Sequence, residues 1–451
     1  MPQKSRISSF KSVIATAVAV GLASQAQAFD LSTAAREALQ FDSTFLSAQK
    51  KADADATRFG QGLGLLLPAA AATASRSRTD FDAESASLTD TKSVFGNTYT
   101  VSLTQPIFRL DRLAVFNQER LRSKAGVANF TQARIDALLR VTQAYFDVLV
   151  AQDSMNSVEA ELKAIGQQLE SAKRAFEVGT ATITDQQEAQ ARFDLATAKQ
   201  IATKNDLEVK RNALAQLVGK PVPQRLSGLK PDVKIASPEP LDVDKWIDQA
   251  RTANLRVQAA TSAASIATSE LVRVVSADNL PSVDLVARKT RIDPYRAGGL
   301  PPYERADTDV VSVEVTVPLF NGGIAYNRTR EAMALKDKAQ FDLETERRTA
   351  EQLARNAFLG VLAGLSQVRA FEAAEKSSRL ALESNQLGYE VGVRINIDVL
   401  NAQQQLFTTQ RDLSKARYDT LFNSLRLKSA VGTLSEKEID EINELLQKPT
   451  P

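Results

Sequence analysis

Hydrophobic and polar residues alternate with a period of two along several short segments of the chain. Between positions 311 and 317 every second residue is valine, and Ser312, Glu314 and Thr316 lie between the valines. Such alternation predicts a β-strand with one apolar and one polar face. The same pattern, which is less regular in the first half of the chain, predicts strands at residues 69–80, 96–107, 282–292 and 308–318.

Two much longer segments carry the period of an α-helix. Residues 111–178 and 323–391 contain no proline, and apolar residues in the second half of the first segment step alternately by three and four, which is a heptad seam. At 1.5 Å per residue each helix would be roughly 100 Å long. Shorter helices predicted at 31–66 and 185–218 together match the length of the first long one. We therefore expect the two short helices to stack end to end beside it.

The chain contains the same pattern twice. Residues 176–179 (Phe-Glu-Val-Gly) return as 389–392 (Tyr-Glu-Val-Gly), and Gly219 returns as Gly432, in each case 213 positions later. Such self-similarity predicts two structural repeats. The predicted organisation is a first repeat at 29–219, a proline-rich connector at 220–241, a second repeat at 242–432 that ends in a helix at 398–431, and a C-terminal segment at 433–451. That segment is expected to be either a short helix packed against the middle of the molecule or a frayed acidic tail.

The N-terminal residues 1–28 have the composition of a secretory signal peptide. Three basic residues precede an apolar run from Val13 to Ala23, and Ala26 and Ala28 supply the small residues expected before cleavage. The full chain has 56 Lys+Arg and 54 Asp+Glu, so removing three basic and no acidic residues leaves 53 and 54. A net charge near −1 disfavours a nucleic-acid-binding protein. We therefore expect an exported protein without a nucleic-acid partner.

The 451 residues include no His and no Cys. Their absence excludes Ser-His-Asp and Cys-His catalysis as well as metal sites built on imidazole or thiolate ligands. The remaining residues do not assemble a nucleophile with a base. We predict a protein that is not an enzyme and that uses no cofactor and no metal.

Membrane contact, if the protein has any, is predicted to be made by strands. The longest apolar stretch after the leader, residues 63–74, is interrupted by Gly64 and Pro68 and falls short of the ~20 residues that a spanning helix needs. The predicted strands, at about 10–12 residues, have the length of tilted membrane strands. Polar loops are expected at 82–94 and 293–308, flanked by a possible aromatic girdle of Phe81, Phe95, Tyr295 and Tyr303. Four strands cannot close a barrel, so identical chains must share the sheet, in a number that this argument does not fix.

These features, together with several short motifs, resemble the TolC family of outer-membrane channel proteins. The motifs are residues 389–394 (Tyr-Glu-Val-Gly-Val-Arg), residues 398–400 (Asp-Val-Leu), the tail at 427–434, and the strand-to-helix junctions at 106–108 and 318–323. The resemblance implies a mainly α fold with a β-barrel part. In that fold a homotrimer contributes four strands per protomer to a shared 12-stranded outer-membrane barrel, and long coiled-coil helices form a periplasmic tunnel.

The resemblance also implies a function and partners. It implies a passive exit channel of a tripartite efflux or type I secretion system, which conducts proteins or small toxic compounds and whose periplasmic gate opens on partner binding. The implied partners are a periplasmic adaptor (membrane fusion protein), an inner-membrane transporter driven by ATP (ABC type) or by protons, and outer-membrane lipid. The alternative class is a periplasmic coiled-coil adaptor or scaffold protein, which should lack the paired amphipathic strands.

The resemblance places gate residues at five positions, which are Thr184, Asp185, Tyr389, Arg394 and Asp398. We expect Arg394 to pair with Asp185, with Tyr389 hydrogen-bonded nearby. Two ordinary explanations stay open. Arg394 and Asp398 are spaced as a helical i,i+4 pair, and Asp185 with Thr182 fits a helix-capping pattern.

Asp398 carries a second hypothesis. Symmetry copies of this residue around the channel axis would form an acidic ring that selects for cations. The family pattern has another acidic residue three positions on, where this chain has Asn401, so we expect one acidic ring rather than two. On the first long helix, Glu159, Glu161 and Glu170 are predicted to lie on a solvated face.

Overall fold

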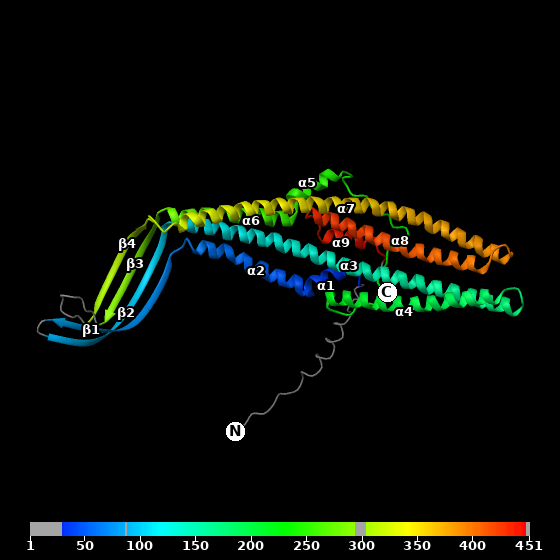
Figure 1. Ribbon diagram of the computed structural model, residues 1–451, viewed down its shortest axis with the longest axis horizontal. Coiled ribbons are helices and arrows are strands. Elements are labelled where there is room, and N and C mark those ends of the chain that lie inside the picture. Colours follow the sequence, from blue (N-terminus) through cyan, green and yellow to red (C-terminus); the bar gives the residue numbers. More distant parts are fainter. Residues whose placement is uncertain (1–28, 86–87, 294–303, 448–451) are drawn as a thin grey trace, which may run out of the picture.

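A computed structural model describes residues 29–85, 88–293 and 304–447. The predicted signal peptide, Tyr295, Tyr303 and the side chain of Phe81 lie outside the described parts. The chain forms a long rod of helices with an antiparallel sheet at one end (Figure 1). No helix within the described residues is both long and apolar enough to cross a membrane.

In the described part of the chain, one sheet contains four strands in the order β1 (Ala69–Ser85), β2 (Leu88–Phe108), β3 (Ser282–Asp293) and β4 (Ala306–Thr316). All neighbouring strands are antiparallel, and β1 pairs with β2 from Ala69 opposite Thr104 to Ser85 opposite Leu88. The loop predicted at 82–94 is therefore wrong, because both strands continue through most of it. Backbone hydrogen bonds between strands do not require an apolar face, so the strands extend beyond the alternating segments from which they were predicted.

The register places apolar residues on one face of the sheet. Val101 and Leu103 of β2 lie on the same face as Val311 and Val313 of β4, and these side chains are exposed in the single chain. The opposite face is polar, and the hydroxyl of Thr100 lies 3.4 Å from that of Thr290. Within the described sheet, β1 and β4 each have one neighbour, so both edges are open for pairing with further strands.

The rod is built on two long helices, α3 (Leu110–Glu177) and α7 (Ile324–Glu390). Each turns back into a shorter helix, α4 (Ile183–Val218) after α3 and α8 (Asn396–Ala430) after α7. The turns lie at the end of the rod farthest from the sheet (Figure 1). We call this end, residues 178–182 and 391–395, the tip.

The helix predicted at 31–66 is broken in two, and the second repeat has the same break. Residues 31–66 form α1 (Leu31–Phe41) and α2 (Ser43–Gly64), and the second repeat has α5 (Val243–Ala253) and α6 (Leu255–Asn279). Asp42 and Asn254 lie at the two breaks, each with a non-helical ψ and each accepting a backbone N–H of the helix that follows. Because these side chains cap the next helix, they end one helix and start another without proline or glycine.

The short helices stack against these breaks beside the long ones. α4 ends at Gly219, whose φ is +76° and whose α-carbon faces Phe41 at the end of α1. Gly432 follows the end of α8; its φ is +72°, and it faces the carbonyl of Ala253 at the end of α5. Both repeats therefore place a glycine with a left-handed backbone where one short helix meets the next.

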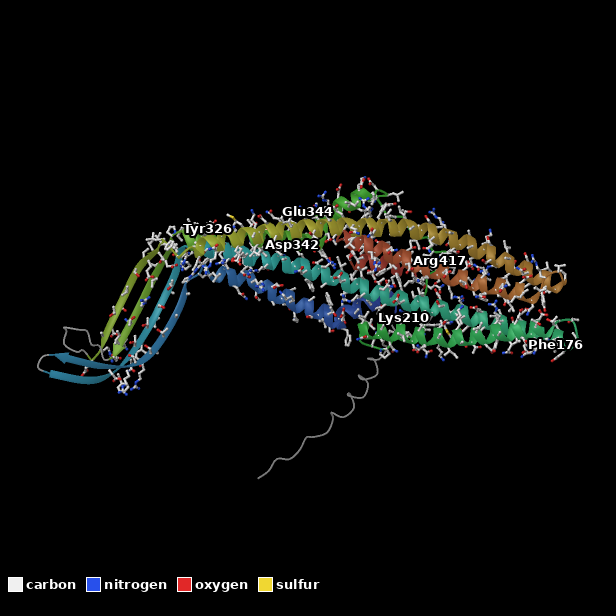
Figure 2. All side chains as sticks on the ribbon, viewed as in Figure 1. Phe176, Lys210, Tyr326, Asp342, Glu344 and Arg417 are labelled. Carbon is white, nitrogen blue, oxygen red and sulfur yellow. The ribbon has the colours of Figure 1, made fainter. Side chains whose placement is uncertain are left out.

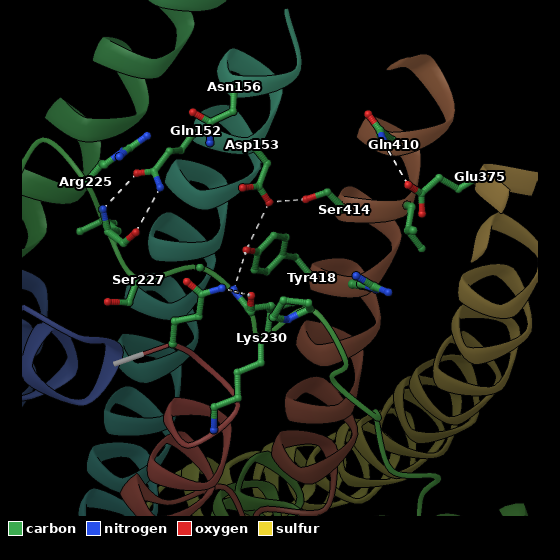
Figure 3. A pocket seen from close by; sticks show the side chains of 17 residues that line it. Gln152, Asp153, Asn156, Arg225, Ser227, Lys230, Glu375, Gln410, Ser414 and Tyr418 are labelled. Atoms are coloured by element: carbon green, nitrogen blue, oxygen red, sulfur yellow. Dashed lines mark hydrogen bonds between the residues drawn. The ribbon is translucent and has the colours of Figure 1, made fainter. Parts of the chain in front are cut away.

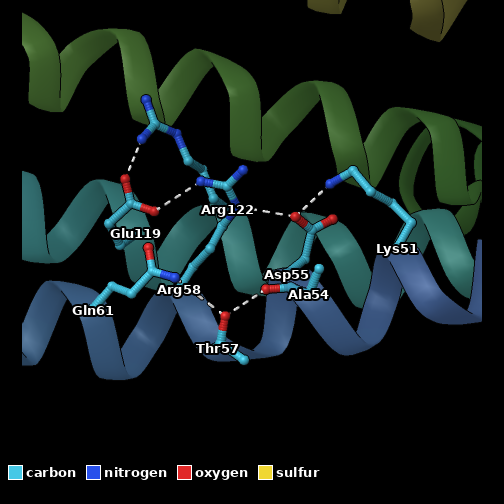
Figure 4. A network of polar contacts seen from close by, with 8 residues as sticks. All are labelled: Lys51, Ala54, Asp55, Thr57, Arg58, Gln61, Glu119 and Arg122. Atoms are coloured by element: carbon cyan, nitrogen blue, oxygen red, sulfur yellow. Dashed lines mark hydrogen bonds and ion pairs between the residues drawn. The ribbon is translucent and has the colours of Figure 1, made fainter.

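Near the sheet, a charge network with buried carboxylates and partly exposed cations links α2 to α3 (Figure 4). Asp55 of α2 pairs with Lys51 and Arg58, and Arg58 also pairs with Glu119 of α3. Gly126 of α3 leaves the space for Asp55, because a β-carbon there would lie 2.7 Å from that of Asp55. Breaking such a buried pair leaves an uncompensated charge, so the network specifies the register between the helices.

The largest apolar core lies at the middle of the rod, where the connector and both ends of the described chain meet α3 and α8. The amide of Leu31 donates to Asn443 at 3.0 Å, and Leu229 of the connector forms a β-bridge with Leu446. Residues Glu436–Asn443 form helix α9, whose Ile439 and Ile442 are buried. Of the two structures considered for the C-terminal segment, the packed helix is therefore correct over these residues.

Candidate functional site

The two turns at the tip have the same geometry. Gly179 and Gly392 have φ values of 76° and 78°, which L-residues rarely adopt. The next amide in each turn bonds back to a carbonyl five residues earlier, from Thr180 to Ala175 at 2.8 Å and from Val393 to Gly388 at 2.9 Å. This is a Schellman-type helix end, and it reverses the chain without burying unpaired carbonyls.

Apolar side chains are exposed around these turns. They belong to both hairpins, and they are Phe176, Val178, Ile183, Leu387, Val391, Val393 and Ile395. Figure 2 shows Phe176 at the end of the rod opposite the sheet. An exposed apolar group of this kind marks a surface that other protein segments cover.

Asp185 of the predicted gate caps the start of α4. Its carboxylate accepts from the backbone N–H of Thr182 at 2.9 Å and from the Thr182 hydroxyl at 2.7 Å, and its own amide donates to that hydroxyl at 3.2 Å. This reciprocal arrangement is a capping box. The capping explanation for Asp185 is therefore correct in the single chain, and Thr184 beside it is exposed.

Arg394 lies 3.7 Å from Asp398 as an i,i+4 ion pair. The Arg394 side chain is 58% exposed, so solvent screens the pair and it is worth only ~0–1 kcal/mol. The single chain thus shows the neighbouring pair, and the pairing of Arg394 with Asp185 stays a prediction. Tyr389 is half-buried in the last turn of α7.

Asn401 lies on the exposed side of α8, where the acidic residue of the family pattern would stand. Its side-chain oxygen accepts from Arg192 of α4 at 3.0 Å, and the same guanidinium donates to Gln404 at 2.7 Å. The amide therefore joins the first repeat to the second at a position where a carboxylate would have made an ion pair.

Asn396 is a further link between the repeats, and it was not predicted from the sequence. It is 1% exposed, it accepts from Gln168 of α3 at 2.5 Å, and it donates to the backbone carbonyl of Asp185 at 3.3 Å. Both hairpins therefore meet at one buried amide immediately above the tip turns. A single Asn at a helix start carries no sequence signal that separates this role from ordinary capping.

Glu161 corrects the prediction of a solvated face on α3. Its residue exposure is 5%, and one carboxylate oxygen lies 3.1 Å from the ammonium of Lys199 on α4 and 2.9 Å from the guanidinium of Arg411 on α8. The length argument placed only the two short helices of the first repeat beside α3. A third helix, α8 of the other repeat, buries Glu161, whereas Glu159 and Glu170 are exposed as predicted.

On the side of Glu161 away from the tip, a polar pocket of about 570 Å³ opens between α3, α8 and the connector (Figure 3). Asp153 accepts from Ser414 at 2.5 Å and from Tyr418 at 3.5 Å. Burial raises the pKa of Asp153 above its usual value, and these hydrogen bonds and the charge of Arg417 offset only part of that rise. Burial likewise raises the pKa of the Tyr418 hydroxyl.

A sheet with open edges at one end of two helical hairpins is the protomer of an elongated oligomeric channel. Comparison with known proteins gives the family. The model of the family described as outer membrane efflux protein matches the chain twice, over residues 33–220 and 246–433. The chain belongs to this family.

Two relatives have the same sequence identity to this chain. The chain is 30% identical to the outer membrane protein TolC of Vibrio cholerae over 348 residues, which are 76% of this chain and 78% of that protein. It is also 30% identical to the alkaline protease secretion protein AprF of Pseudomonas aeruginosa over 343 residues, which are 76% of this chain and 70% of that protein. The resemblance to the TolC family inferred from the motifs is thereby confirmed.

Among solved structures, the outer membrane protein VceC of Vibrio cholerae superimposes with a TM-score of 0.76, over 89% of this chain and 96% of that one, at 18% identity. The fold is that of the trimeric channels, in which four strands of each protomer enter a shared barrel and long helices form a tunnel. The protein is an outer-membrane exit channel for efflux or type I secretion, and its tunnel extends into the periplasm. The periplasmic adaptor alternative is not favoured, and the family is one of transport channels rather than enzymes.

Proposed function

We propose that three copies of this chain form a passive conduit whose periplasmic gate is the tip. Three protomers with four strands each would close a barrel of twelve strands, which removes the open edges of β1 and β4. The observation that carries the gate proposal is the pair of matching tip turns, where Asp185, Arg394 and Asp398 lie within three residues of exposed apolar side chains.

The links at the tip are suited to a gate that opens readily. Each exposed pair is weak, and three symmetry copies of a link worth ~0.5 kcal/mol sum to ~1.5 kcal/mol, or about a tenfold shift in the ratio of open to closed channels. A partner that binds the open tip more tightly than the closed one therefore needs little differential affinity to open it. Arg394 is proposed to contribute through Asp398 and Asp185, and Thr184 and Tyr389 through neighbouring hydrogen bonds.

The proposed partners are a periplasmic adaptor, which would cover the apolar side chains at the tip, and an inner-membrane transporter of the ABC or proton-driven type. The relatives named for protease secretion and for TolC support a role in secretion or efflux. Complementation of a channel-deficient strain, scored for both protein secretion and drug tolerance, separates the two kinds of cargo.

The gate is tested by single-channel conductance of the purified trimer in planar bilayers. Arg394→Ser should raise the conductance of the resting channel, and Asp398→Ala should lower its selectivity for cations because the acidic ring is lost. Asp342→Asn is a matched control, since Asp342 forms an exposed i,i+4 pair with Lys338 on α7 (2.7 Å) away from the tip (Figure 2). Wild-type conductance in Arg394→Ser would refute the latch, and unchanged selectivity in Asp398→Ala would refute the ring.

A further inference from the structure

Glu161 is the point at which a buried charge joins three helices from both repeats. Its carboxylate on α3 contacts Lys199 of α4 and Arg411 of α8, and the side chain of Glu161 is 6% exposed while that of Arg411 is 14% exposed. Lys199 is more exposed, at 40%. The bond between Glu161 and Arg411 is therefore the shielded part of the cluster, and it crosses from the first repeat to the second.

Arg411 is held from several sides. In addition to Glu161 it donates to the hydroxyl of Ser157 on α3 at 3.3 Å and to the hydroxyl of Thr408 on its own helix at 3.0 Å. Ser157 in turn donates to the backbone carbonyl of Phe407 at 3.3 Å. Arginine has a planar set of donors, and this arrangement uses several of them to fix the position of α8 along α3.

On the tip side of Arg411, Leu400 of α8 packs in an apolar cluster with residues of α3 and α4, and the hydrogen bonds between α8 and the first repeat are of a different kind. They are Gln168 to Asn396, Asn396 to the carbonyl of Asp185, and Arg192 to Asn401 and Gln404. All the acceptors in this set are neutral amides or carbonyls. When α8 moves away and water enters, these neutral acceptors can bond to water instead, whereas separating Arg411 from Glu161 leaves a shielded charge without that partner.

We propose that Glu161 is a positioning residue for the gate: it anchors α8 at Arg411, so that opening moves the part of α8 between the tip and Arg411 while the rest of the tunnel wall stays in place. The inference rests on the proposed location of the gate at the tip. α7 packs along the length of α8, so the adjoining part of α7 moves with it. The anchor thereby sets the length of the moving segment and hence the width of the open channel.

The test compares the conductance of full-length trimers in planar bilayers in two backgrounds, wild type and Arg394→Ser. Glu161→Gln alone should conduct like the wild type, because the tip is still latched. In the Arg394→Ser background, Glu161→Gln should raise the conductance further, by roughly twofold or more, because an uncompensated Arg411 releases α8 over a longer stretch. Glu161→Asp, which keeps the charge, should preserve the narrower opening. Asp342→Asn serves as the control in both backgrounds.

The outcomes separate the anchor from the gate. If Arg394→Ser raises the conductance but adding Glu161→Gln changes nothing, the anchor is refuted and the gate stands. If Arg394→Ser has no effect, the proposed gate is refuted, and the anchor with it. If Glu161 only stabilised the fold, Glu161→Gln would lower the thermal stability in both backgrounds, and it would not raise the conductance in the Arg394→Ser background alone. Should Glu161→Gln fail to assemble, Arg411→Gln gives the same comparison, because it removes the same ion pair from the α8 side.

Discussion

Three glycines have nearly the same backbone conformation but different surroundings. Replacing each by alanine therefore separates two contributions to the loss in free energy of unfolding, which are backbone strain and steric overlap of the added methyl group. Gly179, Gly219 and Gly432 have φ values of 76°, 76° and 72°. A β-carbon on Gly179 would have no atom within 4 Å, one on Gly219 would overlap the ring of Phe41, and one on Gly432 would lie 2.8 Å from the backbone oxygen of Ala253. Alanine at Gly179 therefore pays only for the left-handed backbone, about 1 kcal/mol.

The other two substitutions add a steric term. Phe41 is 55% exposed, so in Gly219→Ala its ring can turn away from the added methyl group and lose its contact, which adds about 1 kcal/mol. The carbonyl of Ala253 belongs to the backbone at the end of α5, and moving it disturbs the packing of α5 on α7, which adds about 2 kcal/mol. The expected order of destabilisation is Gly179→Ala, then Gly219→Ala, then Gly432→Ala.

Thermal unfolding of the purified variants, followed by far-ultraviolet circular dichroism in one detergent, measures this order. In a chain of this size each kcal/mol corresponds to roughly 1–2 °C in the unfolding midpoint. Gly219→Ala in a Phe41→Ala background is the control, because removing the ring should remove the steric part of its cost. If Gly179→Ala lowers the midpoint as much as Gly432→Ala, the steric reasoning is wrong.

Two further predictions concern single residues. Because the pKa of Asp153 is raised on folding above its ordinary value of 3.8, the folded state holds this proton more tightly, and stability is lost as the pH rises from that value through the raised pKa of the folded state. Asp153→Asn should remove this loss and give a flatter dependence of the unfolding midpoint on pH in that range, and equal slopes for both proteins would contradict the prediction. Thr182→Ala should lose the α4 capping box at a cost of about 1 kcal/mol and speed hydrogen exchange at the Asp185 amide, while Thr182→Ser should not; unchanged exchange in Thr182→Ala would rule out the capping role.

The parts of the fold that could be predicted are those with strong local signals. The long helices are marked by the absence of proline within them and by a glycine just after their C-terminal ends. The bounds of α3 and α7 lie within one residue of the ranges predicted at 111–178 and 323–391. The breaks at Asp42 and Asn254 were missed because both residues are compatible with a helix interior and reveal themselves as caps only when a neighbouring helix ends against them.

The site was predictable only in part, because its contacts cross between repeats. Arg394 and Asp398 are four positions apart, so their pairing could be anticipated from spacing. Glu161 and Arg411 are 250 positions apart, and no periodicity along α3 indicates that a helix from the other repeat will bury one of its polar positions. Predicting Glu161 as solvated followed from considering one neighbour where the fold supplies two.

The contacts at the middle of the rod bring the two ends of the described chain together. Asn443 accepts from the amide of Leu31 and donates to Asp30 at 2.8 Å, and Ser32 donates to Asp440 at 2.5 Å. Because the first and last described residues lie side by side, the path of the chain through the two repeats returns close to its starting point. A circular permutant that joins these ends and opens the exposed part of the connector near Ser237 would present the repeats in reverse order and still build the same wall. The architecture of the protomer therefore does not depend on which repeat comes first in the sequence.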